Sequence, residues 1–356
     1  MVKKQKNMIK YIIRRILMMI PMLLIVLTLT WFLSRMMSID PVTNKIAGAI
    51  TDPEALEAYL QSIGYYDPWF VQLGSYFLKF FTGDWGDSYV VFENQPIINI
   101  VFEIFPRTIE LMIIPIILTP IIAVKLGVSS SVQKDKKKDM LIRTVAILGA
   151  GFPVFWIGSM AQIFFGYFLN LFTRGSLDFP VFFSNSTRIN SIIPDNAPTT
   201  GFRLIDCIIY NDQVYLWDTI LHLIIPALCI TFVSLANITR QTRSSMLDVL
   251  NQDYIRTARA KGVIEKDVIN KHALRNALLP VSNLIIQGTA TALLGSFFIE
   301  ITFVYKGYGY YMVAAIVLGD YLLINGLLIV ATIIILSGTL VADVMYTIID
   351  PRITYR

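Results

Sequence analysis

The residues best suited to a specific contact lie in one charged segment between two long apolar runs. It contains the sequence DYIRTARAKG, from Asp253 to Gly262, followed by HALRNALLP, from His272 to Pro280. Its carboxylate, guanidinium and ammonium groups can form charge-assisted hydrogen bonds with a second protein or with anionic lipid. The segment therefore predicts a docking surface rather than a catalytic site.

Hydrophobic spacing predicts that this segment is helical. Apolar residues recur there at three- and four-residue intervals, at Met246, Val249, Leu250, Tyr254 and Ala258. Because glycine tolerates a left-handed backbone, we expect this helix to end at Gly262, and a second short helix, from about Glu265 to Ala277, to lead into the next apolar run. The alternative is an amphipathic helix that rests on anionic lipid.

No other group of residues suggests chemistry. The cysteines, Cys207 and Cys229, are too few for a disulfide framework, so we expect no disulfide. The histidines, His222 and His272, lie outside any Cys-x-x-Cys or His-Glu-x-x-His pattern, so no metal site is expected. The sequence also lacks a Gly-x4-Gly-Lys-Ser/Thr loop, so ATP hydrolysis would have to come from another polypeptide.

Composition indicates which elements position the charged segment. The chain has 356 residues, 55% of them apolar and 15% charged, and a mean hydropathy of +0.61, which is typical of a polytopic membrane protein. A spanning helix needs about 20 apolar residues. Six runs meet this length: Ile12 to Met36, Thr108 to Val128, Met140 to Phe172, Trp217 to Ile238, Ala277 to Ile299 and Tyr321 to Ile349. The third run exceeds the bilayer thickness, so we expect it to tilt or to project beyond the lipid.

Basic residues predict the orientation. Lys and Arg are concentrated in the N-terminus, Lys134 to Lys138, Arg240 to Arg275 and the tail, which places both ends in the cytoplasm. The first run lacks a small-residue cleavage site, so we interpret it as a retained span. The net charge of +5 then reflects topology rather than nucleic-acid binding. Two long outer segments, Met37 to Arg107 and Thr173 to Asp218, are expected to form ordered surface.

A polar stripe in the fifth run predicts a route through the membrane. Asn283, Gln287 and Thr291 recur every four residues, which places them on one helical face. Helix-to-helix hydrogen bonding inside the bundle is the alternative. Ionisable residues are scarce deep in the runs, which argues against an ion-driven carrier.

Motifs along nearly the whole chain resemble the permease subunits of ABC importers, in the branch that carries peptides and nickel. The charged segment matches that branch's loop, although Arg256 and Thr257 depart from the wider Glu-Ala-Ala-x3-Gly pattern. Further matches are GDWGDSY from Gly83, GFPVFWIG from Gly151, HLIIPAL from His222 and DPR from Asp350. Lys306 and Tyr308 stand where the branch usually has proline and leucine.

The resemblance implies an all-α, type I importer permease without cofactor or catalytic residue, in a prokaryotic cell membrane. It implies an N-terminal part of residues 1–103, a permease domain of residues 104–347 with an outer insertion at 173–218 and a coupling loop at 240–276, and a tail of residues 348–356. The residues implied to contact the ATPase are Asp253, Tyr254, Arg256, Thr257, Ala258, Arg259, Lys261 and Gly262.

The resemblance also implies partners: a second permease, two ATPase subunits and an external substrate-binding protein. Di- or oligopeptides are the expected cargo, with oligosaccharides or nickel as alternatives. A stand-alone secondary carrier or channel is the remaining alternative.

Overall fold

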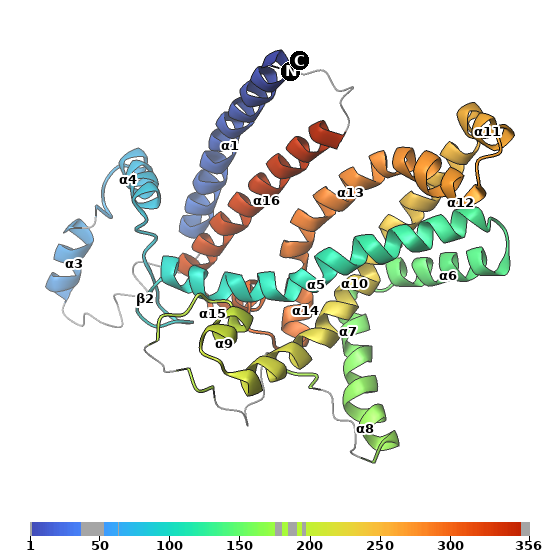
Figure 1. The fold of residues 1–356 in the computed structure, drawn as a ribbon. Coiled ribbons are helices and arrows are strands. Elements are labelled where there is room, and N and C mark those ends of the chain that lie inside the picture. Colours follow the sequence, from blue (N-terminus) through green and yellow to red (C-terminus); the bar gives the residue numbers. More distant parts are fainter. Residues whose placement is uncertain are drawn as a thin grey trace. The chain divides into compact units, whose positions relative to one another are not determined.

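The computed structural model describes residues 2–36, 53–62, 64–174, 180–183, 191–193 and 197–349. Among them, five stretches are long and apolar enough to cross a membrane: Tyr11–Leu33, Ile97–Val132, Val154–Phe172, Gln213–Leu250 and Tyr321–Val341. The remaining predicted span is occupied by helix α13 (Leu274–Gly295), whose side chains are described up to residue 289. The all-α, six-span prediction is confirmed (Figure 1).

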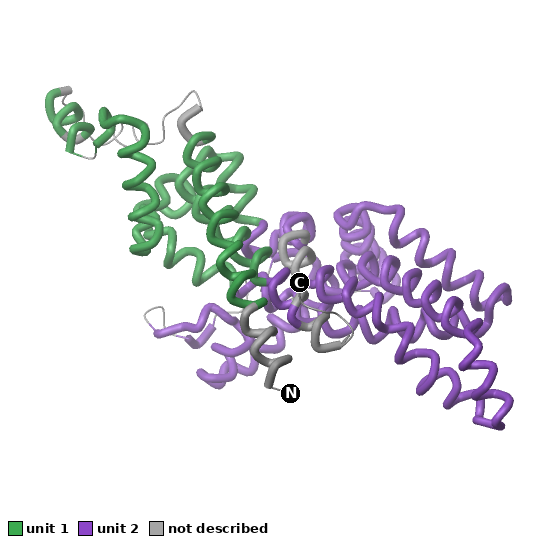
Figure 2. Tube along the Cα trace, turned by 90° about the horizontal axis from the view of Figure 1, so that it is seen from above, with its two compact units in different colours: residues 1–105, 310–337 green, residues 106–309, 338–356 purple. Residues whose placement is uncertain are grey.

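One compact unit comprises residues 1–105 and 310–337 (Figure 2). Its elements are α1 (Val2–Met36), α3 (Pro53–Ser62), α4 (Trp69–Thr82), the paired strands β1 (Asp87–Ser88) and β2 (Gln95–Pro96), the start of α5 (Ile97–Val132), most of α15 (Tyr308–Leu318) and the first part of α16 (Tyr321–Ile349). The two strands are antiparallel, with Ser88 opposite Gln95.

Buried Asp320 orders the loop motif that begins at Gly83. Its carboxylate accepts hydrogen bonds from Ser88 Oγ at 2.6 Å and from the backbone N–H groups of residues 89–91 at 3.1 to 3.2 Å. Gly83 itself has φ +83° and caps α4, which explains the glycine at that position. The prediction of ordered structure is therefore confirmed for this part of the segment Met37 to Arg107.

The other unit comprises residues 106–309 and 338–356. Besides the rest of α5 and α16, its elements are α6 (Lys137–Gly151), α7 (Val154–Gln162), the π-helix η1 (Ile163–Phe168), α8 (Leu169–Phe172), α9 (Arg203–Ile209), α10 (Gln213–Leu250), α11 (Asp253–Ala260), α12 (Glu265–Asp267), the π-helix η2 (Val268–Ala273), α13 and α14 (Phe297–Thr302). Helix α10 lies at its centre and packs against α6, α7, α9 and α13.

The long third run is two helices, so the expectation of one tilted or projecting helix is wrong. Phe152 takes an extended backbone after α6, and α7 begins beyond Pro153. Proline has no N–H for a helical hydrogen bond, and it disfavours helical backbone in the residue before it. The spanning part is therefore Val154–Phe172, while α6 packs along α10.

Candidate functional site

Helix α11 is the structured core of the charged segment, and Gly262 terminates it as predicted. Gly262 has φ +77°. Its N–H donates to the carbonyl oxygen of Arg259 at 3.0 Å, and the N–H of Val263 donates to that of Ala258 at 3.2 Å. These two bonds form a Schellman motif, in which apolar residues flanking the glycine usually meet. Ala258 and Val263 both pack against the same apolar cluster, so the turn is fixed by bonds and by burial.

The apolar edge of α11 differs from the predicted one. The helical spacing is interrupted after α10, because Asn251 and Gln252 lie outside both helices. Ile255 is completely buried, whereas the predicted Tyr254 is 42% exposed. Ile255 packs in a cluster with Met246 of α10 and Ala277 of α13. The predicted continuation of one apolar edge through Tyr254 is therefore wrong, because the break changes which face of the next helix meets the core.

Helix α11 is fastened to the helix that follows it. The Arg259 guanidinium donates twice to the Glu265 carboxylate, at 2.8 and 3.1 Å. This pairing holds the pKa of the Glu265 carboxyl below its usual value. The Asn276 side-chain amide donates to the Tyr254 hydroxyl at 2.8 Å. The predicted second short helix is the first part of a longer one, because α12, η2 and α13 follow one another without a gap from Glu265 to Gly295.

The remaining predicted contact residues of α11 face away from this core. Asp253, Arg256, Thr257 and Lys261 are exposed, and Ala258 is half-buried. Arg256 lies 3.5 Å from Asp253, and both side chains are largely exposed. Their charged groups are accessible to a partner surface, whereas Arg259 is already engaged by Glu265.

An ion pair that the sequence analysis missed joins α6 to α10 near the charged segment. Arg243 donates to both oxygens of Asp139, at 2.8 and 2.7 Å. The Asp139 side chain is 0% exposed and that of Arg243 19% exposed. Ser130 also donates to Asp139, and these donors, with Arg243 foremost, hold the pKa of the Asp139 carboxyl well below its usual value. In the sequence, the one feature that could have indicated this ion pair is Asp139, an acid directly after the basic run Lys136 to Lys138.

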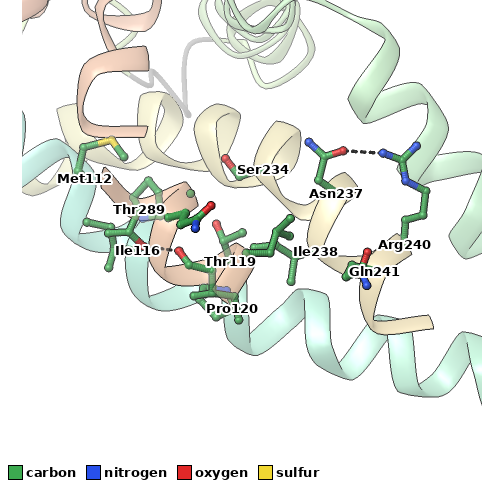
Figure 3. A pocket seen from close by; sticks show the side chains of 15 residues that line it. Met112, Ile116, Thr119, Pro120, Ser234, Asn237, Ile238, Arg240, Gln241 and Thr289 are labelled. Atoms are coloured by element: carbon green, nitrogen blue, oxygen red, sulfur yellow. Dashed lines mark hydrogen bonds between the residues drawn. The ribbon is translucent and has the colours of Figure 1, made fainter. Parts of the chain in front are cut away.

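A cavity of about 530 Å³ lies among α5, α10 and α13 (Figure 3). Its lining residues are Met112, Pro115, Ile116, Thr119 and Pro120 of α5, Ser234, Asn237, Ile238, Arg240 and Gln241 of α10, and Leu284, Ile285, Gln287, Gly288 and Thr289 of α13. The cavity therefore lies between α13, which follows the charged segment, and two neighbouring spans, α5 and α10.

Only part of the predicted polar stripe Asn283, Gln287 and Thr291 is found to line the cavity. Gln287 lines it and is exposed, whereas Asn283 is not among its lining residues. Positions four apart advance about 40° around a helix of 3.6 residues per turn, so a stripe drifts across the face. The side chain of Thr291 lies outside the described residues. Leu284 and Ile285 line the cavity as well, so the accessible face of α13 is wider than its polar residues indicate.

Comparisons with known proteins cover nearly the whole chain. Residues 123–355 match the family described as the binding-protein-dependent transport system inner membrane component. Residues 8–112 match the family described as the N-terminal part of a binding-protein-dependent transport system membrane component.

Full-length relatives carry related names. The chain is 36% identical to a dipeptide transport system permease protein of Alkalihalophilus pseudofirmus, over 98% of this chain and 100% of the relative. It is 33% identical to an oligopeptide transport system permease protein of Bacillus subtilis, over the same shares. It is 34% identical to a dipeptide transport system permease protein of Escherichia coli K12, again over 98% and 100%.

Proposed function

The chain belongs to the inner membrane components of binding-protein-dependent transport systems, and from this membership we propose that it is a permease subunit of an ATP-driven importer of di- and oligopeptides. It forms part of the route across the cell membrane and transmits movement from ATPase subunits to that route. ATP binding and hydrolysis occur on those subunits. The cytoplasm contains both ends of the chain and α11, in agreement with the excess of Lys and Arg there.

One observation supports this proposal: the exposed helix α11 is hydrogen-bonded to the continuous helix that becomes α13 and lines a cavity. α11 is held by the Gly262 turn, by Arg259 with Glu265 and by Tyr254 with Asn276. The anchoring residues belong to the continuous helix that becomes α13, and α13 supplies five of the cavity-lining residues. A displacement imposed on α11 is therefore passed to the cavity wall, as alternating access requires.

The proposed assembly contains a second permease, two ATPase subunits and an external substrate-binding protein. Asp253, Arg256, Thr257 and Lys261 contact the ATPase, and Tyr254, Ala258, Arg259 and Gly262 hold the helix in position for that contact. Gln287, Asn283 and Thr291 of α13 are proposed as pathway residues, with Gln287 best supported because it lines the cavity. The division at residues 103/104 and 347/348 is likewise a proposal.

Purification and transport test this function directly. Affinity purification of the tagged chain, co-produced with its transport system, is expected to retain ATPase subunits and a second permease. The assembly in liposomes, supplied with its binding protein, is expected to accumulate trialanine only when ATP is present. Purification without ATPase, or accumulation driven by an ion gradient alone, would support a stand-alone carrier. Accumulation of Ni²⁺ or maltotriose instead of trialanine would show that the cargo is nickel or an oligosaccharide rather than a peptide.

A charge swap separates a positioning role of Arg259 from direct contact. Arg259→Glu is expected to weaken ATPase copurification and to uncouple hydrolysis from uptake, because two acids would then repel each other across the turn. The double substitution Arg259→Glu, Glu265→Arg is expected to restore coupling. The native pair is 42% and 56% exposed, so its loss should cost only about 0 to 1 kcal/mol of stability. Membrane abundance should therefore remain near that of the unsubstituted chain.

The comparison variant is Arg256→Glu, which changes a more exposed arginine of the same helix. It should weaken copurification with no rescue by Glu265→Arg. If the Arg259–Glu265 swap also fails to rescue, Arg259 contacts the ATPase itself. If Arg259→Glu changes only the binding of α11 to anionic vesicles, the helix rests on lipid and the docking proposal fails.

A further inference from the structure

The cavity has an uneven distribution of charge. Arg240 contributes a guanidinium group at one end, and its Nη2 donates to Asn237 Oδ1 at 2.9 Å (Figure 3). Gln241, Gln287 and Thr289 add amide and hydroxyl groups, and none of the described lining residues is acidic. A guanidinium group offers paired N–H donors that fit a carboxylate. The lining therefore favours an anionic group near Arg240 and disfavours a metal cation.

Unused hydrogen-bonding capacity lies on α5. The Thr119 hydroxyl oxygen is buried and has no hydrogen-bond partner among the described residues, and the side chain lines the cavity. Pro120 has no N–H, so the carbonyl of Ile116, four residues earlier, lacks its helical donor. A buried polar group without a partner costs stability, which a bound donor would recover. These acceptors suit an ammonium group or an amide N–H.

The backbone levels of the two ends, along the helix axes, differ by about the length of a short peptide. Ala123 and Ile238 belong to one apolar cluster, and one turn further on Gly127 meets Thr242, so α5 and α10 approach each other there and run in the same direction. Thr119 is then level with Ser234, six residues before Arg240 on α10, a rise of about 9 Å. An extended peptide of two or three residues spans about 7 to 11 Å.

We propose that this cavity is a transient binding site for short peptides with free termini. Arg240 binds the terminal carboxylate, and the Thr119 hydroxyl and the Ile116 carbonyl accept hydrogen bonds from the amino end. The proposal rests on the peptide-import function, and it adds a selectivity step inside the membrane that does not depend on the external binding protein. Neutral oligosaccharides and Ni²⁺ lack the carboxylate that this arrangement recognises.

Protection from labelling tests the site without the binding protein. The assembled transporter would carry Gln287→Cys in a background with Cys207→Ser and Cys229→Ser, and its labelling by a soluble methanethiosulfonate would be measured. Trialanine is expected to slow labelling at concentrations about tenfold lower than trialanine amide, because only the free acid pairs with Arg240. With Arg240→Gln the two peptides should protect equally weakly. The two peptides are also compared on the protein that keeps Arg240. Misfolding of Arg240→Gln therefore cannot produce the difference between trialanine and trialanine amide.

A matched control is Arg143→Gln, which removes an exposed arginine of α6 that does not line the cavity. This control should leave the preference for trialanine unchanged. Three results would each overturn the site. The protein that keeps Arg240 could be protected equally by the two peptides, or trialanine could give it no protection. Arg143→Gln could also lose the preference for trialanine in the same way as Arg240→Gln. ATP-dependent uptake of trialanine by the assembly without substitutions is measured in parallel. Absence of that uptake counts against the import function, whereas normal uptake without the labelling difference counts against this site alone.

Discussion

Gly262→Val is expected to abolish uptake while leaving membrane insertion and abundance largely unchanged. Gly262 has φ +77°, a conformation that costs an L-residue roughly 1 to 2 kcal/mol, and a β-branched side chain is among the least tolerant of it. A Cβ at this position would meet nothing within 4 Å, so the cost is conformational rather than steric. The bonds to Arg259 and Ala258 that fix the direction of α11 would be lost. The ATPase would then meet a helix at the wrong angle.

Gly262→Asn is the matched control for this prediction. Asparagine adopts the left-handed conformation more readily than other non-glycine residues, so this variant should keep most of its uptake. The measurements are ATP-dependent uptake at equal membrane abundance and ATP hydrolysis by the assembly. Normal uptake by Gly262→Val, or equal loss in the asparagine variant, would show that the left-handed turn is not what couples α11 to transport.

Asp139→Asn is expected to lower the stability of the protein by about 3 to 5 kcal/mol, the range for breaking a buried ion pair. The substitution keeps the size of the side chain but leaves the largely buried Arg243 guanidinium without its counter-charge. Thermal unfolding in detergent should show the loss. Asp267→Asn is the control, because its pair with Lys271 is 41% and 71% exposed and should contribute only about 0 to 1 kcal/mol.

A second substitution and a pH series sharpen this test. Asp139→Leu combined with Arg243→Met should recover much of the stability, since no unpaired charge remains. The pKa of Asp139 lies below that of an unfolded aspartate, so its contribution is present above the unfolded value of about 3.9 and is lost as pH falls through the folded value. Between pH 5 and 8 the pair should therefore give a constant contribution. Equal unfolding temperatures for Asp139→Asn and Asp267→Asn would disprove the structural importance of this pair.

The sequence by itself determined the features that depend on local composition and local backbone preference. Apolar runs of spanning length predicted the six spans, since a membrane accepts only long apolar helices. The glycine at position 262 predicted the end of α11, because the left-handed turn is a property of that single residue. The family resemblance rested on motifs spread along the chain, and the matched families cover residues 8–112 and 123–355.

Only the tertiary structure decided which residues face one another. The turn at Asn251 and Gln252 exchanged Tyr254 for Ile255 as the buried residue, because a short break rotates the helix that follows. Asp139 and Arg243 are 104 residues apart and meet only because α6 packs along α10. Periodicity placed Asn283 and Gln287 on one face, but the positions of α5 and α10 determine that Gln287 borders the cavity and Asn283 does not. Contacts between distant segments depend on packing, and a pattern within one segment contains no information about its neighbours.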